Sequence, residues 1–158
     1  MEPRDDVSNQ VRLEFPNLPQ NVGFARVAMA VFAAQLDFTL DELEDIKVAV
    51  SEAVSNAVIH AYEQARGTVV VEGCIREGRL EVAVLDRGKG IENIQLACQP
   101  AFTTQPEERM GLGLVFVKEF MDTVNIESEP GQGTRIEMSK IPQNTSPCPG
   151  SEGGRGGS

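Results

Sequence analysis

The sequence predicts an α+β fold, a two-layer sandwich in which three helices cover one face of a mostly antiparallel sheet. Two observations lead to this class. Apolar residues recur with helical spacing in some segments and with the period of two of a half-buried strand in others. The strand-like segments of the second half come in pairs joined by tight turns, which favours antiparallel pairing with helices on one face. The expected element order is β-α-α-β-β-α-β-β.

The first half of the chain predicts one strand and two helices. VRLEF (11–15) alternates apolar and polar residues, and a helix over 22–36 follows it. Thr39 and Glu42 fit a capping box that opens a second helix over 40–63. The apolar stripe expected on the first helix is Phe24, Val27, Ala28, Val31, Phe32 and Leu36. The apolar face expected on the second is Ile46, Ala49, Val50, Ala53, Val54, Ala57, Val58 and Ala61.

The second half predicts two β-hairpins separated by a long loop and a helix. The hairpin strands are 68–76 with 80–86, and 123–128 with 134–140. The inner side of the 80–86 strand carries Leu80, Val82 and Val84. Turn-forming residues over 99–109 have the composition and length of a mobile lid, and a helix over 111–122 follows.

Composition places residues 1–142 in one domain and the Gly/Ser/Pro-rich residues 143–158 in a disordered tail. The formal charge of −10 argues against a general nucleic-acid binder. No apolar run approaches the roughly 20 residues that span a bilayer, so no membrane partner is expected. The cysteines stand far apart without a CxxC spacing, which is typical of a reduced, cytoplasmic protein.

A column of polar residues stands out within VSEAVSNAVIHAY. Glu52, Asn56 and His60 are four residues apart, so they stack on one helix face. Glu52 and Asn56 lie roughly opposite the apolar face, and we expect both outside the core. A carboxylate there can accept a proton, and an amide oxygen suits Mg²⁺, which takes its other ligands from water and phosphate. For His60 we expect a structural or pocket-edge position.

Glycine-containing motifs mark three element ends. DRGKGI places Asp86 at the end of an apolar strand, where its carboxylate can accept a hydrogen bond from an exocyclic amine. GLGL opens the last helix, whose free N–H groups can bind phosphate. No Gly-Lys-Ser/Thr follows, which excludes a Walker loop. GQGT (131–134) forms the turn of the last hairpin.

The stretches FARVAMAVFAAQLD, EDIKVAVSEAVSNAVIHAY, DRGKGI and ERMGLGL resemble the Bergerat-type ATP-binding fold of gyrase, Hsp90, histidine kinases and MutL. Within that group the chain is most similar to the bacterial anti-sigma serine kinases, closest to those that act on the sporulation sigma factor, sigma F. The resemblance covers about residues 10–140, with four motifs in order. One departure is Ala61, where the family has glycine and where we expect only a stiffer helix end.

The resemblance implies a site for ATP or ADP with Mg²⁺. Glu52 would be the catalytic base and Asn56 the Mg²⁺ ligand. Asp86 would bind the adenine amine with the support of Thr134. The other nucleotide-binding residues that it implies are Gly88, Gly90, Arg109, Gly111, Leu112 and Gly113. Outside this site, it implies that Arg26 contacts the sigma factor.

The function that the resemblance implies is that of an anti-sigma factor with protein serine/threonine kinase activity. It would bind sigma F in an ATP-dependent way as a homodimer and phosphorylate a serine of its anti-anti-sigma antagonist. Two alternatives stay open: a general-stress-type anti-sigma kinase, and an ATP-gated binding module without kinase activity. A free-standing ATPase or histidine-kinase-like domain is disfavoured, because neither a transducer domain nor a phosphoacceptor is recognisable.

Overall fold

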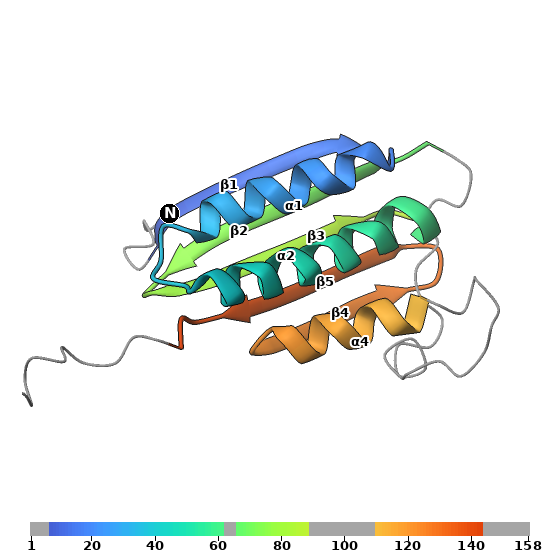
Figure 1. Ribbon diagram of the computed structural model, residues 1–158. Coiled ribbons are helices and arrows are strands. Elements are labelled where there is room, and N and C mark those ends of the chain that lie inside the picture. Colours follow the sequence, from blue (N-terminus) through green and yellow to red (C-terminus); the bar gives the residue numbers. More distant parts are fainter. Residues whose placement is uncertain (1–6, 62–65, 89–109, 144–158) are drawn as a thin grey trace, which may run out of the picture.

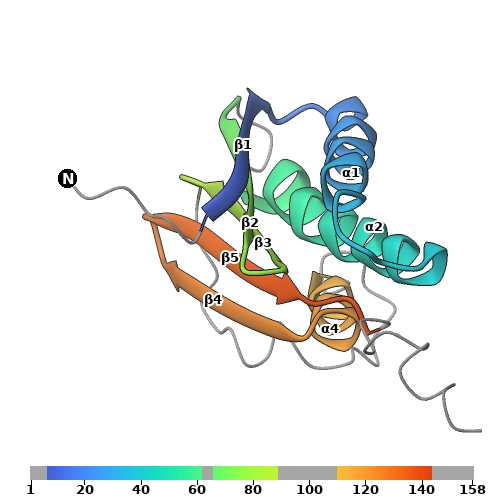
Figure 2. The same ribbon diagram turned by 90° about the vertical axis from the view of Figure 1, so that its left-hand side faces the viewer.

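Figure 1 shows the computed structural model of the protein, which describes residues 7–61, 66–88 and 110–143. The predicted fold class is confirmed. Five antiparallel strands form a sheet in the order β1-β2-β3-β5-β4, and the described helices all cover one face of it, as the edge-on view in Figure 2 shows. The elements are β1 (Val7–Pro16), α1 (Gln20–Ala33), α2 (Leu40–Ser55), η1 (Asn56–Ala61), β2 (Thr68–Arg76), β3 (Arg79–Asp86), α4 (Met110–Phe120), β4 (Thr123–Glu129) and β5 (Gly133–Lys140).

Strand β1 is longer than the predicted 11–15. It begins at Val7 and pairs with β2 as far as Pro16, which lies opposite Thr68. The first residues, VSNQ, show no apolar alternation, so their extended conformation follows from backbone pairing with β2 rather than from burial of side chains. Pro16 is accepted because it stands at the end of an edge strand, where a missing N–H breaks no central ladder.

Helix α1 faces the sheet with a stripe that only partly matches the predicted one, since Phe32 is buried and Leu36 packs against the core as expected. The buried residues are Ala25, Met29, Phe32 and Ala33. Phe24, Val27 and Val31, which were predicted to be buried, are 56%, 53% and 68% exposed. The reason is close packing over Gly73 of β2. The position of a Cβ at Gly73 would lie 3.0 Å from the Met29 sulfur, so the missing side chain selects which face of α1 packs there.

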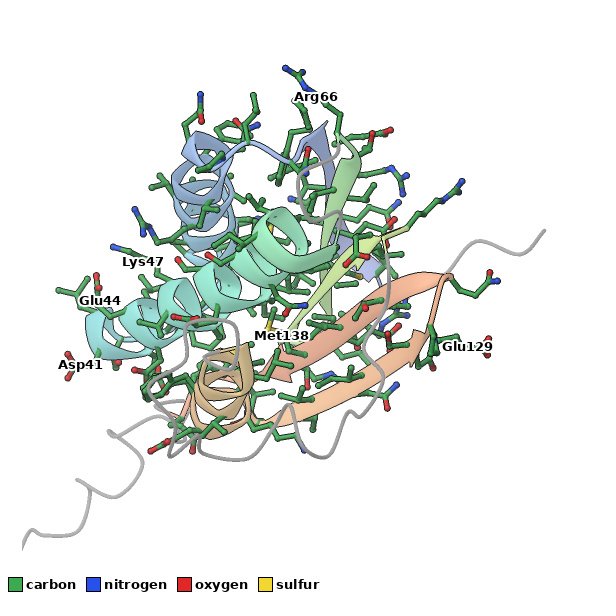
Figure 3. The ribbon with its side chains drawn as sticks, turned by 90° about the vertical axis from the view of Figure 1, so that its right-hand side faces the viewer. Asp41, Glu44, Lys47, Arg66, Glu129 and Met138 are labelled. Carbon is green, nitrogen blue, oxygen red and sulfur yellow. The ribbon has the colours of Figure 1, made fainter. Side chains whose placement is uncertain are left out.

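Helix α2 has the predicted cap and the predicted apolar face. The Thr39 hydroxyl accepts the Glu42 N–H at 3.1 Å, and the Glu42 carboxylate accepts the Thr39 N–H at 2.8 Å. Each of the eight predicted apolar-face residues, on α2 and η1, is buried. Asp41, Glu44 and Lys47 point away from the sheet in Figure 3, and Lys47 pairs with Glu44 at 2.9 Å.

The core lies between the helices and the inner face of the sheet. Helix α2 packs between α1 and α4, and the predicted inner residues of β3 are all buried. The inward residues of the other strands and of α4 complete the core: Val69, Val71, Ile75, Leu114, Val117, Met121, Ile136 and Met138. No helix of the described residues is both long and apolar enough to cross a membrane.

Candidate functional site

The C-terminal end of α2 widens into the π-helical turn η1 at Asn56. A π turn inside a helix frequently marks a functional site. Asn56 was predicted to lie outside the core, and that prediction is wrong: its side chain is 7% exposed. The helical wheel could not show this, because the burial comes from tertiary neighbours. The turn η1 contacts α4, β3 and β5, which surround this end of the helix.

The side-chain oxygen of Asn56 is buried and has no hydrogen-bond partner among the described residues. Leaving such a group unsatisfied costs about 1–3 kcal/mol, so an orphaned oxygen in a native fold calls for an explanation. A neutral amide oxygen is a hard donor of the kind that Mg²⁺ accepts. No cluster of three or more His, Cys, Asp or Glu residues accompanies it in the described part of the chain. A metal here would therefore need its other oxygens from water and a bound ligand.

Glu52 lies one turn before Asn56, as predicted from their spacing. Its side chain is half-buried, and burial raises the pKa of its carboxyl above the usual value. The neighbouring Ser51 hydroxyl oxygen is also buried without a partner among the described residues. His60 belongs to η1, but its side chain lies outside what the structure describes.

Asp86 ends β3 in a buried position, 8% exposed. Burial raises the pKa of its carboxyl, while the backbone N–H groups of Gly88 and Thr134 donate to it and oppose that rise. The Gly88 N–H lies 2.9 Å from Oδ1. Thr134 stands directly opposite Asp86 on β5 and is 5% exposed. The two predicted adenine-binding residues are thus brought together at one end of the sheet.

Two glycines hold the backbone around Asp86. A Cβ at Gly88 would lie 2.1 Å from the carbonyl oxygen of Ala61, so here the missing side chain admits the end of η1. Gly133 has φ of +107°, and a Cβ there would lie 2.2 Å from the carbonyl oxygen of Asp86. Gly133 was not among the predicted site residues, although its place before Thr134 in GQGT was a usable signal.

Ser128 is a further polar residue that the sequence did not single out. It pairs with Thr134 across β4 and β5, and the two hydroxyl oxygens are 2.9 Å apart. The only sequence signal for it is the register of the last hairpin, which places it opposite Thr134.

The remaining predicted residues are placed only in part. Gly111, Leu112 and Gly113 lie in the first turn of α4, which begins at Met110, but their side-chain surroundings are outside the described residues. Gly90, Arg109 and the predicted lid are outside them as well. Arg26 is half-buried on α1, which packs on β1 and β2, whereas Asp86 and Thr134 lie on β3 and β5.

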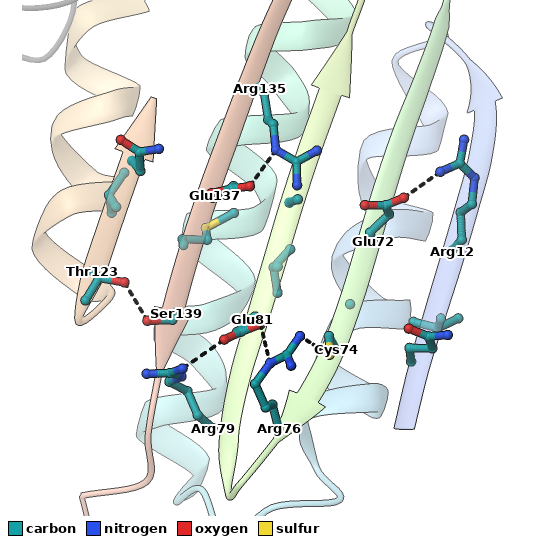
Figure 4. Close-up of a pocket in the computed structure, with 18 residues that line it drawn as sticks. Arg12, Glu72, Cys74, Arg76, Arg79, Glu81, Thr123, Arg135, Glu137 and Ser139 are labelled. Carbon is teal, nitrogen blue, oxygen red and sulfur yellow. Dashed lines mark hydrogen bonds and ion pairs between the residues drawn. The ribbon is translucent and has the colours of Figure 1, made fainter. Parts of the chain in front are cut away.

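Two cavities lie along the sheet. One of about 790 Å³ is lined by Asp86, Ser128, Gly133 and Thr134, among others. A second of about 870 Å³ lies on the face opposite the helices and includes none of the predicted site residues (Figure 4). Its charged side chains neutralise one another in pairs such as Arg12 with Glu72 and Arg76 with Glu81, which is typical of an open, solvated sheet face. The first cavity contains the Asp86–Thr134 end of the candidate site, while Glu52 and Asn56 are not among its lining residues.

Comparisons with known proteins identify the family of this chain. Residues 15–140 match the sequence model of the histidine kinase-like ATPase domain. The chain is 49% identical to an anti-sigma F factor of Clostridium kluyveri over 134 residues, 84% of this chain and 94% of that protein. It is 52% identical to one of Anoxybacillus flavithermus over 134 residues, 84% and 92% of the two chains. It is 46% identical to one of Caldanaerobacter subterraneus subsp. tengcongensis over 136 residues, 85% and 95% of the two chains. Because both the domain and most of each chain match, this protein belongs to the anti-sigma F factor family of histidine kinase-like ATPase domains.

Proposed function

We propose that the protein is an anti-sigma factor that captures sigma F in an ATP-dependent way and phosphorylates a serine of its anti-anti-sigma antagonist. The observation that carries the proposal is the buried, unpartnered oxygen of Asn56, one helical turn from Glu52. An unsatisfied oxygen beside a half-buried carboxylate suits a site that is completed by a bound metal–nucleotide complex and then does proton chemistry.

The nucleotide would lie between η1 and the end of the sheet. The Asp86 carboxylate accepts a hydrogen bond from the adenine amine, and Thr134 supports the same base. The α4 N-terminus offers the N–H groups of Gly111, Leu112 and Gly113 to the phosphates, since unpaired N–H groups and the helix dipole favour anions there. Gly88, Gly90 and Arg109 are the other proposed contacts, with Arg109 on the γ-phosphate.

Asn56 would hold Mg²⁺ through its side-chain oxygen. The fit rests on that oxygen being buried, neutral and without a partner in the described structure. The ion supplies charge neutralisation and alignment of the phosphate oxygens. A neutral ligand adds no negative charge beside a triphosphate, and one protein ligand plus phosphates and water is the usual pattern for this ion.

Glu52 would act as the general base. The serine oxygen of the antagonist forms a bond to the γ-phosphorus as the bond to the bridging oxygen of ADP breaks, and the serine proton passes to the Glu52 carboxylate. Burial raises the pKa of the Glu52 carboxyl above its usual value, which increases its affinity for a proton. The presence of a carboxylate one turn from Asn56 favours a kinase over an ATP-gated binding module without chemistry.

The sigma factor would contact α1 around Arg26. The exposed apolar side chains of Phe24, Val27 and Val31 lie on the same helix, and a cluster of exposed apolar residues is typical of a protein–protein contact. We further propose that the protein works as a homodimer in the cytoplasm. The sporulation role and the identity of the antagonist belong to the same proposal.

The proposal is tested with purified components. Sigma F is mixed with the immobilised protein in Mg²⁺–ATP, in Mg²⁺–ADP or without nucleotide, and the retained fraction is measured. The antagonist is then added with ATP, and its intact mass is recorded. We expect the greatest retention with ATP and a mass gain of one phosphate. Equal retention under all three conditions would contradict the ATP gate, and an unchanged mass would favour the binding module.

A further inference from the structure

Three polar residues form one cross-strand row at the candidate site. Asp86 of β3 lies opposite Thr134 of β5, and Thr134 lies opposite Ser128 of β4. Directly opposed residues of antiparallel strands share a face and have Cβ atoms about 4.5–5.5 Å apart. All three residues line the cavity of about 790 Å³. The hydroxyl of Thr134 is therefore flanked by a carboxylate on one side and by a second hydroxyl on the other.

The protons of this row can be counted. The Ser128 hydroxyl donates its one proton to the carbonyl oxygen of Gly133 at 3.0 Å, because a carbonyl cannot donate. Ser128 then has only lone pairs left for the Thr134 hydroxyl, 2.9 Å away. With the Ser128 proton on Gly133, the Thr134 hydroxyl is the donor in that pair. Its own oxygen consequently presents only lone pairs to any other group.

We propose that Ser128 is a specificity-determining positioning residue, which holds the Thr134 hydroxyl as a hydrogen-bond acceptor toward position 6 of a purine base. The inference rests on the proposed adenine-nucleotide function and deepens it. Asp86 and Thr134 then form a pair of acceptors side by side. Such a pair can accept hydrogen bonds from an exocyclic amine, directly or through a water that donates to Thr134. It offers no donor to a carbonyl oxygen at the same position, so that oxygen binds less well.

Adenine and hypoxanthine differ at position 6 and at the adjoining N1, which accepts a hydrogen bond in adenine and carries a proton in hypoxanthine. Both differences are the same for the parent and for a Ser128 variant, so a change in the ratio of the two affinities reports the altered Thr134 hydroxyl. The 6-amine of adenine donates hydrogen bonds, while the 6-oxygen of hypoxanthine accepts them. If Ser128 loses its hydroxyl, the Thr134 O–H can rotate and donate to a 6-oxygen. Loss of the Ser128 hydroxyl should therefore reduce the preference for adenine over hypoxanthine. This effect is expected even though Thr134 lies between Ser128 and Asp86 in the row.

A purely structural cross-strand hydroxyl pair is the competing explanation, and the same two strands contain a matched example. Thr123 of β4 and Ser139 of β5 lie opposite each other with their hydroxyl oxygens 2.5 Å apart. This pair lines the cavity of about 870 Å³, which includes none of Asp86, Ser128 and Thr134. Ser139→Ala removes a hydroxyl from the same hairpin without touching the row beside Asp86.

The test measures dissociation constants for ADP and IDP by calorimetry on the full chain, in the parent and in Ser128→Ala, Ser128→Cys, Ser128→Thr and Ser139→Ala. We expect the IDP/ADP ratio of dissociation constants to fall by about two- to twelvefold in Ser128→Ala, the size of one neutral hydrogen bond. Ser128→Cys should give a similar fall, because a thiol is a weak acceptor, and it guards against a folding defect of the alanine variant. Ser128→Thr and Ser139→Ala should keep the parental ratio.

A parental ratio in Ser128→Ala and Ser128→Cys would overturn the inference and leave the pair structural. An equal fall in Ser139→Ala would also overturn it, because the effect would then belong to the hairpin as a whole. A parent that binds ADP no better than IDP would contradict the proposed adenine site itself. That outcome differs from the other two, in which the parent keeps its preference.

Discussion

Replacing Asn56 by leucine should stabilise the protein without nucleotide while removing its response to Mg²⁺. The side chain is 7% exposed and its oxygen has no partner in the described structure, so the fold carries the cost of a buried unsatisfied acceptor. That cost is about 1–3 kcal/mol, and leucine of similar size removes it. For a chain of this length each kcal/mol shifts the melting temperature by about 2–4 °C, so we expect a rise of about 2–12 °C. Differential scanning calorimetry without nucleotide measures it.

The same variant is then titrated with ATP at several Mg²⁺ concentrations. We expect the parent to bind ATP more tightly as Mg²⁺ rises and Asn56→Leu to show no such dependence. Ser51→Ala is the matched control, because it removes a second buried oxygen that has no partner among the described residues, while leaving Asn56 in place. A lower melting temperature for Asn56→Leu would refute the reasoning about the orphaned oxygen, and an unchanged Mg²⁺ response would refute the ligand role.

Three further predictions concern the proposed adenine contact of Asp86, the capping box of α2 and the proposed sigma-factor surface on α1. Asp86→Asn should weaken ATP binding and make the stability of the fold less dependent on pH. Burial raises the pKa of Asp86 in the folded protein, so its contribution to stability falls as pH rises from the ordinary aspartate pKa through that folded value. Thermal melts of the parent and the variant across pH check this. Thr39→Ala should cost about 1 kcal/mol by loss of the capping box. Burial acts to raise the pKa of Glu42, but hydrogen bonds hold that pKa below its usual value. The contribution of the capping box to stability should therefore be lost as pH falls through the lowered pKa, and urea unfolding at two pH values would show this. Val31→Lys should change the free energy of unfolding by no more than about 0.5 kcal/mol, because Val31 is 68% exposed. The same variant should retain less sigma F, and an unchanged retention would contradict the proposed α1 contact.

The sequence predicted most of this fold because the patterns that it carries are local. The period of two located four of the five strands closely, and the capping box located the start of α2. The exposed stripe of α1 was misjudged because Val27 and Val31 look like core residues in a helical wheel. Only the position of Gly73 on β2 shows that Met29 packs there beside the predicted Phe32.

The candidate site was predictable in its residue types but not in its environment. Spacing placed Glu52 and Asn56 on successive turns, yet the burial of Asn56 depends on α4 and two strands that are distant in sequence. Ser128 was missed because a lone serine in a strand has no motif, and its contact with Thr134 comes from hairpin register. The close approach of Ala61 to Gly88 could not be predicted either, because the two segments are distant in sequence.

The central claim is that this ATP site performs phosphoryl transfer with Glu52 as its base. The most direct measurement is the rate of transfer of labelled γ-phosphate to the anti-anti-sigma protein by Glu52→Ala, beside ATP binding on the same preparation. Glu44→Ala is the matched control, because Glu44 is an exposed glutamate of the same helix that pairs only with Lys47 among the described ion pairs. We expect Glu52→Ala to bind ATP and sigma F nearly as the parent does and to transfer phosphate about 10²–10⁴-fold more slowly. Transfer at the parental rate by Glu52→Ala would contradict the account.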